Sequence, residues 1–224
     1  KLEAETGQAV DWKKVGSLRL ASSPERMREV QQLATTAKSF GLEMELISGE
    51  EAQKLFPLID PKGVLGAAYL PTDGQIDPSS VTQALAKGAR DRGTQIVKGC
   101  TVEGVRSTNR QVTEVVTNDG VWTCDTFINA SGMWSRELGA LSNVRIPACA
   151  LEHQYIITEA IPGMPKDMPT MRDPDRLVYY KPEPNGMVIG GYEPNTQPFG
   201  NDDIPAGFGR ELLDSNLDRF GQLA

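Results

Sequence analysis

The sequence has few of the residues from which metal sites and disulfide frameworks are built. His153 is the only histidine, and the three cysteines, Cys100, Cys124 and Cys149, contain no CxxC pair. A metal cluster of imidazoles is therefore excluded, and so is any mechanism that needs two histidines. The odd number and wide spacing of the cysteines favour reduced, packed thiols over disulfides or a zinc site. We predict no metal site.

The chain also lacks long basic and long apolar runs. Its formal net charge is −7, which argues against a nucleic-acid surface. No apolar run approaches the roughly 20 residues of a membrane span, so neither nucleic acid nor membrane is an expected partner. The 224 residues, 39% of them hydrophobic, suffice for one large domain or two small ones. The chain begins at Lys1 rather than Met, and we interpret its start as cut.

The hydrophobic patterning predicts a mixed α/β (α+β) fold in which the kinds of secondary structure change along the chain. In the first part, hydrophobic periodicity and capping residues predict strands within 11–21, 43–48 and 64–70, and helices 23–40, 49–55 and 79–92. The middle part predicts a short strand 94–99, hairpin strands turning at 109–110 and 119–120, an apolar strand 121–129 and a helix. After residue 146 short strands dominate, with a turn at 185–186, and the tail from 206 predicts a helix.

In the stretch "FINASGMW", residues 127–134, the side chains become small at Ala130, Ser131 and Gly132, where the predicted strand ends and a helix begins. Small residues at such a junction allow a phosphate or a sugar edge to approach the backbone closely. The alternative is tight packing of helix against strand. Spacing alone leaves both interpretations open.

In its context this stretch resembles the second half of the FAD-binding domain in the D-amino acid oxidase (DAO) family of flavoproteins. "NASGMW" matches the family's Ala-x-Gly-x-Trp pattern, and "PTDGQIDPSS" is similar to its Pro-x-Asp-Gly segment. "CTVEGV" is similar to the strand whose valine, here Val102, meets the adenine side of FAD through its backbone. The resemblance implies contacts to FAD from Val102, Ala130, Ser131, Gly132 and Trp134. It extends over nearly the whole chain.

The sequence departs from that family in one respect. Its members begin with a βαβ unit that carries GxGxxG, and this chain has no such motif. The string "GFGREL", residues 207–212, lacks the third glycine and follows no strand, so we reject it. The chain therefore resembles an internal fragment. We expect FAD to be the cofactor of the parent protein and expect this fragment alone to bind it weakly or not at all.

His153 and Tyr179 are the candidate catalytic residues. From the residues alone, a lone histidine on the predicted strand "LEHQY" is more typical of a hydrogen-bonded core residue. However, "EHQYIITE" and "LVYYKPEPNGMVIGGYEP" are similar to substrate-domain strands of the dimethylglycine and sarcosine dehydrogenase and oxidase subgroup. That resemblance implies that His153 and Tyr179 lie beside the substrate amine and border one pocket. Tyr180 is predicted to face the core, and Tyr192 is a weaker pocket candidate.

The resemblance implies a division into two lobes. Residues 77–145 form the second part of a FAD-binding domain, and 1–76 and 146–224 form a substrate domain around a mostly antiparallel sheet. The implied activity is the FAD-dependent demethylation of a small N-methylated amino acid, such as dimethylglycine or sarcosine, by hydride transfer to the flavin. The implied electron acceptor is oxygen or an electron-transfer flavoprotein, and the expected location is the cytoplasm, or the mitochondrial matrix in a eukaryote.

Two alternative functions remain open from the sequence. Some relatives of this subgroup are non-catalytic regulatory subunits, although the presence of His153 and Tyr179 argues against that role. The other alternative is a general D-amino acid or glycine oxidase of the DAO family, for which the "EHQY" and "YY" strands are less typical.

Overall fold

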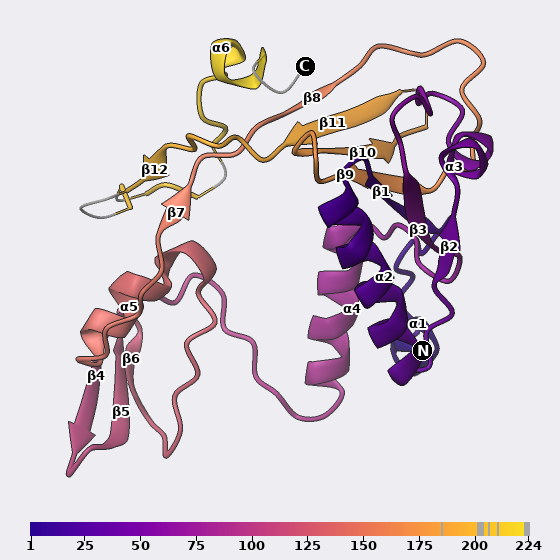
Figure 1. The fold of residues 1–224 in the computed structure, drawn as a ribbon. Helices are drawn as coiled ribbons and strands as arrows, with labels where there is room; N and C mark the ends of the chain where they lie inside the picture. The colour runs from indigo at the N-terminus through magenta and orange to yellow at the C-terminus, as the bar shows by residue number, and fades with distance from the viewer. Residues whose placement is uncertain (185, 201–203, 206, 210, 222–224) are drawn as a thin grey trace. The chain divides into compact units, whose positions relative to one another are not determined.

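A computed structural model describes residues 1–184, 186–200, 204–205, 207–209 and 211–221 (Figure 1). The chain forms two compact units. Unit 1 comprises Lys1–Gly93, His153–Pro194 and Ser215–Ala224, and unit 2 comprises Thr94–Glu152 and Asn195–Asp214. No helix among the described residues is long and apolar enough to cross a membrane.

Unit 1 contains a seven-stranded sheet in the order β2-β3-β1-β9-β10-β11-β8, which can be followed in Figure 1. Neighbouring strands are antiparallel except β1 and β9, which run parallel. The predicted mixed α/β class with mostly antiparallel sheets is therefore confirmed. The strands of this sheet are β1 (Ser17–Ala21), β2 (Glu45–Ile47), β3 (Gly66–Leu70), β8 (Tyr155–Ile157), β9 (Thr170–Asp173), β10 (Val178–Pro182) and β11 (Met187–Gly191).

The helices of unit 1, apart from the first, begin at capping residues that the sequence supplies. Ser23 Oγ accepts the backbone N–H of Arg26 at 3.1 Å, and Ser48 forms a capping box with Glu51. Asp77 Oδ1 likewise accepts a backbone N–H, at 2.6 Å, at the next helix. The helices are α1 (Leu2–Thr6), α2 (Pro24–Ser39), α3 (Gly49–Leu55), α4 (Pro78–Arg90) and α6 (Leu217–Phe220).

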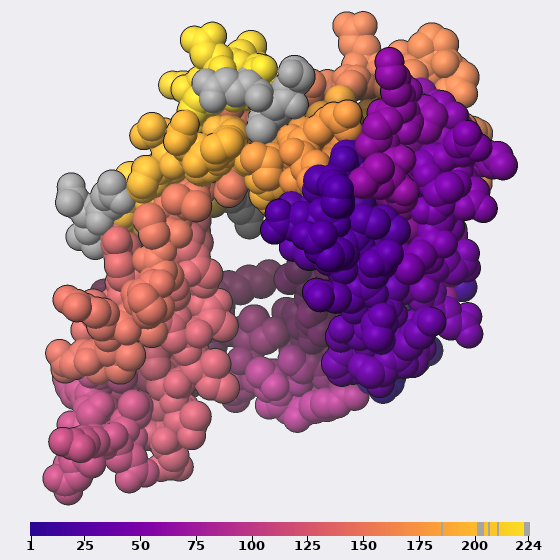
Figure 2. All heavy atoms as spheres, in the orientation of Figure 1, coloured from indigo at the N-terminus to yellow at the C-terminus, as the bar shows by residue number. Residues whose placement is uncertain are grey.

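The boundary between the units differs from the boundary between the predicted lobes. Helix α4 belongs to unit 1 because it packs against α1. A Cβ placed on Gly88 would lie only 3.2 Å from Thr6, and Arg92 forms an ion pair with Glu5 at 3.3 Å. In Figure 2 the N-terminal part of unit 1, in indigo and purple, is closely packed. The assignment of FAD-binding and substrate roles to the two parts stays a prediction.

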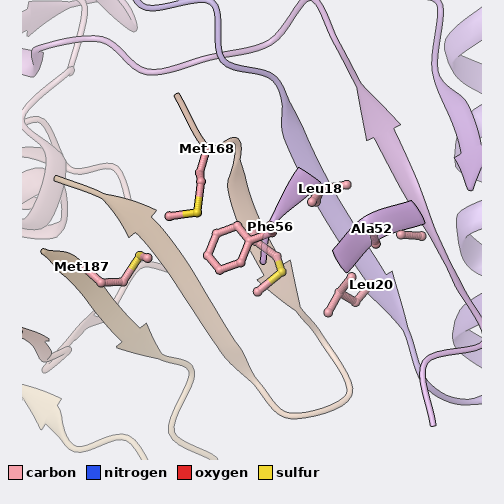
Figure 3. Packing of buried hydrophobic residues seen from close by; sticks show 8 residues of the cluster. Leu18, Leu20, Ala52, Phe56, Met168 and Met187 are labelled. Carbon is pink, nitrogen blue, oxygen red and sulfur yellow. The ribbon is translucent and has the colours of Figure 1, made fainter. Parts of the chain in front are cut away.

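The two faces of the sheet in unit 1 bury different side chains. Helix α2 covers one face, where Val30 packs against Ala21 and Ala68. The main core lies on the other face, where Phe56 is 1% exposed and lies among aliphatic and methionine side chains (Figure 3). Tyr180 belongs to this core side, as predicted, with its ring 6.2 Å from that of Phe56. The remaining buried residues of this core are Leu18, Leu20, Ala52, Ala67, Met168, Met171 and Met187.

Unit 2 has a three-stranded antiparallel sheet of β4 (Val102–Thr108), β5 (Gln111–Thr117) and β6 (Gly120–Thr123). Its first turn is the predicted one, because Asn109 and Arg110 both have positive φ, 53° and 66°, as a tight two-residue hairpin requires. The other elements of unit 2 are η1 (Gly132–Trp134), α5 (Ser135–Leu141), β7 (Ala150–Leu151) and β12 (Pro198–Phe199).

Several predicted elements of regular structure are wrong. Residues 94–99 and 124–129 are not strands, because within the described part of the chain no strand pairs with them. Ile128, for example, is 78% exposed. The helix expected from 206 is reduced, among the described residues, to α6, and Leu212 before it is 93% exposed, so no apolar helix face is buried there.

Smaller differences concern one strand, one turn and one thiol. The strand predicted within 11–21 begins only at Ser17, since Lys13 makes no more than an isolated bridge to Gln75. The turn predicted at 185–186 includes Asn185, which lies outside the described residues. The cysteines are free, but Cys149 is exposed rather than packed.

Candidate active site

The two predicted catalytic residues line one cavity of unit 1. This cavity has a volume of about 260 Å³ and is lined by His153, Arg172, Tyr179, Gly191 and Tyr192. Pockets for drug-sized ligands have volumes of roughly 300–1,000 Å³, so this one suits a molecule as small as an amino acid. The predicted proximity of His153 and Tyr179 is found in the structure, whereas their catalytic roles stay predictions.

The register of the sheet determines which side chains of β9, β10 and β11 lie next to one another at the cavity. Tyr179 on β10 lies directly opposite Arg172 on β9 and opposite Gly190 on β11, and Gly190 lies opposite Tyr155 on β8. Directly paired residues of neighbouring strands point to the same face of a sheet. This row therefore lies on the face opposite to Tyr180 and the main core. The ring of Tyr179 occupies the space where any residue other than glycine at 190 would place its Cβ.

His153 reaches the cavity from an irregular segment between β7 and β8. The prediction of a continuous strand through His153 is wrong, because strand pairing is interrupted from residue 152 to 154. The imidazole is exposed, and no described residue forms a hydrogen bond with it, so it is not a hydrogen-bonded core histidine. Its ring lies edge-on to Tyr192 with the centroids 6.5 Å apart, and Tyr192 lies 5.8 Å from Tyr179.

Arg172 is the functional candidate that sequence reasoning missed. Its neighbour on β1, Arg19, forms an ion pair with Glu29 of α2 at 3.4 Å. Within the described residues, by contrast, nothing forms an ion pair or hydrogen bond with the guanidinium group of Arg172. A guanidinium group presents a planar fork of donors that matches a carboxylate. The alternation in "TMRD", with Met171 and Asp173 buried, was the signal that could have placed Arg172 on the opposite face.

The electrostatics of the cavity favour a neutral phenol. Burial raises the pKa of Tyr179, the nearby Tyr192 and Tyr155 raise it further, and the positive charge of Arg172 opposes them. The net shift is upward from an ordinary value of about 10, so the hydroxyl stays protonated at neutral pH. Tyr179 can therefore donate a hydrogen bond to a ligand in the cavity.

The residues predicted to contact FAD lie in unit 2. The side chain of Asn129 shapes this loop, since its Oδ1 accepts from Ser131 Oγ at 2.7 Å and its Nδ2 donates to Ser135 O at 2.8 Å. Gly132 has a φ of +60°, and no described atom lies within 4 Å of where its Cβ would be. Left-handed backbone, and not packing of helix against strand, is therefore what requires this glycine.

The surroundings of Gly132 fit the approach of a large group to this loop. Ala130 is exposed, Ser131 is half-buried and Trp134 is 38% exposed. Val102 lies in β4 opposite Thr117, at an irregularity of the strand pairing. These residues leave room for a cofactor, but their contact with FAD stays a prediction. In the described part of the chain, no group of three or more histidine, cysteine or acidic residues could hold a metal ion.

Cavity volume alone does not identify the site. A hollow of about 530 Å³ beside α5 in unit 2 is lined mainly by the aliphatic residues of segment 144–148, with Arg136 and Arg145. Arg136 is already bonded to Glu137 and to the carbonyl of Gly200. The smaller cavity in unit 1 instead gathers an imidazole, phenols and a guanidinium without a partner among the described residues, which is the set of groups that catalysis and ligand binding use.

The sequence is similar to a family of flavoproteins and to two kinds of dehydrogenase. The sequence matches the FAD dependent oxidoreductase family, DAO, over residues 1–224. It is 35% identical to human mitochondrial dimethylglycine dehydrogenase over 228 residues, which cover 98% of the chain and 26% of that protein. Mouse mitochondrial sarcosine dehydrogenase is 33% identical over 226 residues, covering 99% of the chain and 24% of that protein.

A solved structure with the same fold covers nearly all of the chain. The L-proline dehydrogenase of P. horikoshii aligns with a TM-score of 0.80 and 25% identity, over 99% of this chain and 56% of that one. The chain thus spans about a quarter of the length of the two curated relatives and about half of the solved structure.

Replacement of Gly190 by alanine tests whether the Tyr179 ring needs that space. We expect Gly190→Ala to displace the ring and to lower the free energy of unfolding by about 1–3 kcal/mol, as overpacking does. Gly104→Ala is the matched control in a strand, because its Cβ would meet Val116 at an ordinary 3.8 Å. Urea denaturation and a crystal structure of each variant give the result. An undisplaced ring and wild-type stability in Gly190→Ala would contradict the described packing.

Proposed function

The chain belongs to the DAO family of FAD-dependent oxidoreductases, and we propose that the whole protein demethylates a small N-methylated amino acid such as dimethylglycine or sarcosine. The observation that carries the proposal is the cavity in which Arg172 lies beside Tyr179, Tyr192 and His153. Similarity to dimethylglycine and sarcosine dehydrogenases supports the same substrate class.

The cavity supports recognition of both ends of such a substrate. The carboxylate binds the guanidinium of Arg172, which lacks a partner among the described residues. The methylated amine lies against the rings of Tyr179 and Tyr192, because aromatic faces attract methylated ammonium groups. The volume of about 260 Å³ favours a small amino acid over a larger amine.

His153 and Tyr179 prepare the amine for oxidation. FAD, when bound, supplies the acceptor for the hydride that leaves the N-methyl carbon. A protonated amine has no lone pair to support that loss, so the exposed imidazole of His153 takes up the ammonium proton. The neutral hydroxyl of Tyr179 donates a hydrogen bond that orients the substrate. The resulting imine is hydrolysed to formaldehyde and the demethylated amino acid.

Residues of unit 2 are proposed to hold the cofactor. Val102, Ala130, Ser131, Gly132 and Trp134 are the candidates, and the open space at Gly132 supports a close approach. The proposed electron acceptor is oxygen or an electron-transfer flavoprotein. Because the named relatives are mitochondrial proteins, the proposed location in a eukaryotic cell is the mitochondrial matrix.

The first test of this function removes the proposed catalytic groups one at a time in the full-length protein. We expect His153→Ala and Tyr179→Phe each to slow flavin reduction by dimethylglycine or sarcosine about 10²–10⁴-fold, as loss of a proton-transfer or positioning group does. Anaerobic stopped-flow absorbance measures the rate. Tyr180→Phe is the matched control, because this neighbouring hydroxyl lies on the core side of the sheet.

The same assay separates the alternative functions. No flavin reduction by any amine in the wild type would favour a non-catalytic regulatory homologue. Reduction by glycine or D-amino acids, but not by N-methylated ones, would favour a general oxidase. Wild-type rates in both His153→Ala and Tyr179→Phe would refute the proposed roles of these side chains.

The second test concerns the carboxylate partner. We expect Arg172→Met to raise the KM for sarcosine about 10–100-fold, because a hydrogen bond between charged groups contributes about 1.5–3 kcal/mol. The KM for sarcosinamide, which has the same N-methyl group and no carboxylate, should change little, and Arg172→Lys should recover part of the loss. Steady-state kinetics give both values. An equal effect of Arg172→Met on the two substrates would exclude recognition of the carboxylate by Arg172.

A further inference from the structure

A buried carboxylate directly follows a cavity residue of unit 1 in the sequence. Glu193, the residue after Tyr192, is only 6% exposed. A buried charge is costly unless it is paired and hydrogen-bonded. Glu193 has such partners, since its Oε1 accepts from Gln154 Nε2 at 2.9 Å and its Oε2 lies 3.2 Å from Arg219 Nε. The carboxylate therefore joins two parts of the chain that are distant in sequence.

A second contact fastens the same two parts together. Gln154 Nε2 donates to the carbonyl of Asn216 at 2.7 Å, and the N–H of Asn216 donates to Gln154 Oε1 at 3.0 Å. Asn216 is also the N-cap of α6, because its side chain accepts a hydrogen bond from the backbone N–H of Arg219 at 3.0 Å. Arg219, the partner of Glu193, therefore lies in the first turn of this helix. One short segment, 216–219, thus supplies both the amide contact and the cation.

These contacts form one polar network of Gln154, Glu193, Asn216 and Arg219. Two of its residues are the direct sequence neighbours of residues that line the cavity. Gln154 directly follows His153, and Glu193 directly follows Tyr192. The cavity is lined by His153 and Tyr192, whereas Gln154 and Glu193 are absent from its lining. The rings of His153 and Tyr192 meet edge-on at 6.5 Å, and neither residue lies in a strand of the described structure. The N–H of Tyr192 donates to the carbonyl of Leu177 at 2.7 Å just beyond β11, whereas strand pairing does not fix the backbone of His153, so the placement of His153 in particular depends on other contacts.

We propose that Glu193 and Arg219 are positioning residues, whose ion pair holds His153 and Tyr192 in the geometry that the substrate amine requires. Gln154 and Asn216 complete the same network. The kinetic part of this inference rests on the proposed function, because it assumes that the amine binds beside His153. The structural part does not, because the position of the imidazole can be observed without any substrate.

The experiment compares Arg219→Met and Glu193→Gln in the full-length protein, with selectively ¹³C-labelled histidine. The NMR resonance of His153 is identified by its loss in His153→Gln. We expect both variants to shift or broaden this resonance and to lower kcat/KM for sarcosine about 10–100-fold, since a misplacement of about 1 Å at a reacting group can cost about 10²-fold. Arg219→Lys, which keeps the positive charge, should restore part of both effects.

Arg92→Met is the matched control, because it removes an exposed ion pair with Glu5, and neither of these residues lines the cavity. It should leave the His153 resonance and kcat/KM unchanged. Glu193→Gln preserves the size of the side chain, so it keeps the test decisive if Arg219→Met does not fold.

The outcomes distinguish this inference from the proposed function. A shifted His153 resonance in a protein that oxidises no N-methylated amine would support the positioning role and refute the proposed function. A lower melting temperature with an unchanged His153 resonance and unchanged kcat/KM per folded molecule would overturn the inference, because the network would then be merely structural.

Discussion

The two-residue period of β9 and β10 is the constraint on which the candidate site depends. Met171 and Tyr180 pack into the main core, so Arg172 and Tyr179, the adjacent residues, must lie on the other face. Burial of a large apolar side chain contributes about 1.5–3 kcal/mol, and a slip by one residue would exchange the two faces. The burial that stabilises the sheet therefore also aligns the cationic and phenolic groups of the cavity.

The rest of the cavity comes from segments that the sheet alone does not fix. His153 and Tyr192 lie just outside the ends of strands, whereas Gly190, which leaves space for the ring of Tyr179, lies within β11. Irregular segments can present side chains at angles that a strand does not allow, but they need contacts that hold them in place. The buried Glu193 and its partners provide such contacts in unit 1. The proposed amine site thus combines Arg172 and Tyr179, which the sheet positions, with His153 and Tyr192, whose segments are held by polar contacts.

Sequence reasoning predicted the elements whose causes are local. The capping serine at position 23 and the turn at Asn109-Arg110 are each specified within a few residues, and each is found. Segments 94–99 and 124–129 have the composition of strands, but a strand also needs a partner, which composition does not reveal. The packing of α4 on α1, which sets the unit boundary, is likewise a contact between segments distant in sequence.

The candidate site was predicted in part, because His153 and Tyr179 are uncommon residues in recognisable strings, whereas an arginine in an alternating strand is typical of a solvent-exposed face. The proposed role of Arg172 depends on the lack of a partner for its guanidinium group among the described residues, which only the structure reveals. The most direct test of the account is a crystal structure of the full-length protein with methylthioacetate, an unreactive carboxylate of similar size. We predict carboxylate oxygens about 2.7–2.9 Å from the guanidinium of Arg172, with the methyl group against Tyr179 and His153. A ligand bound elsewhere, with no contact to Arg172, would contradict the account.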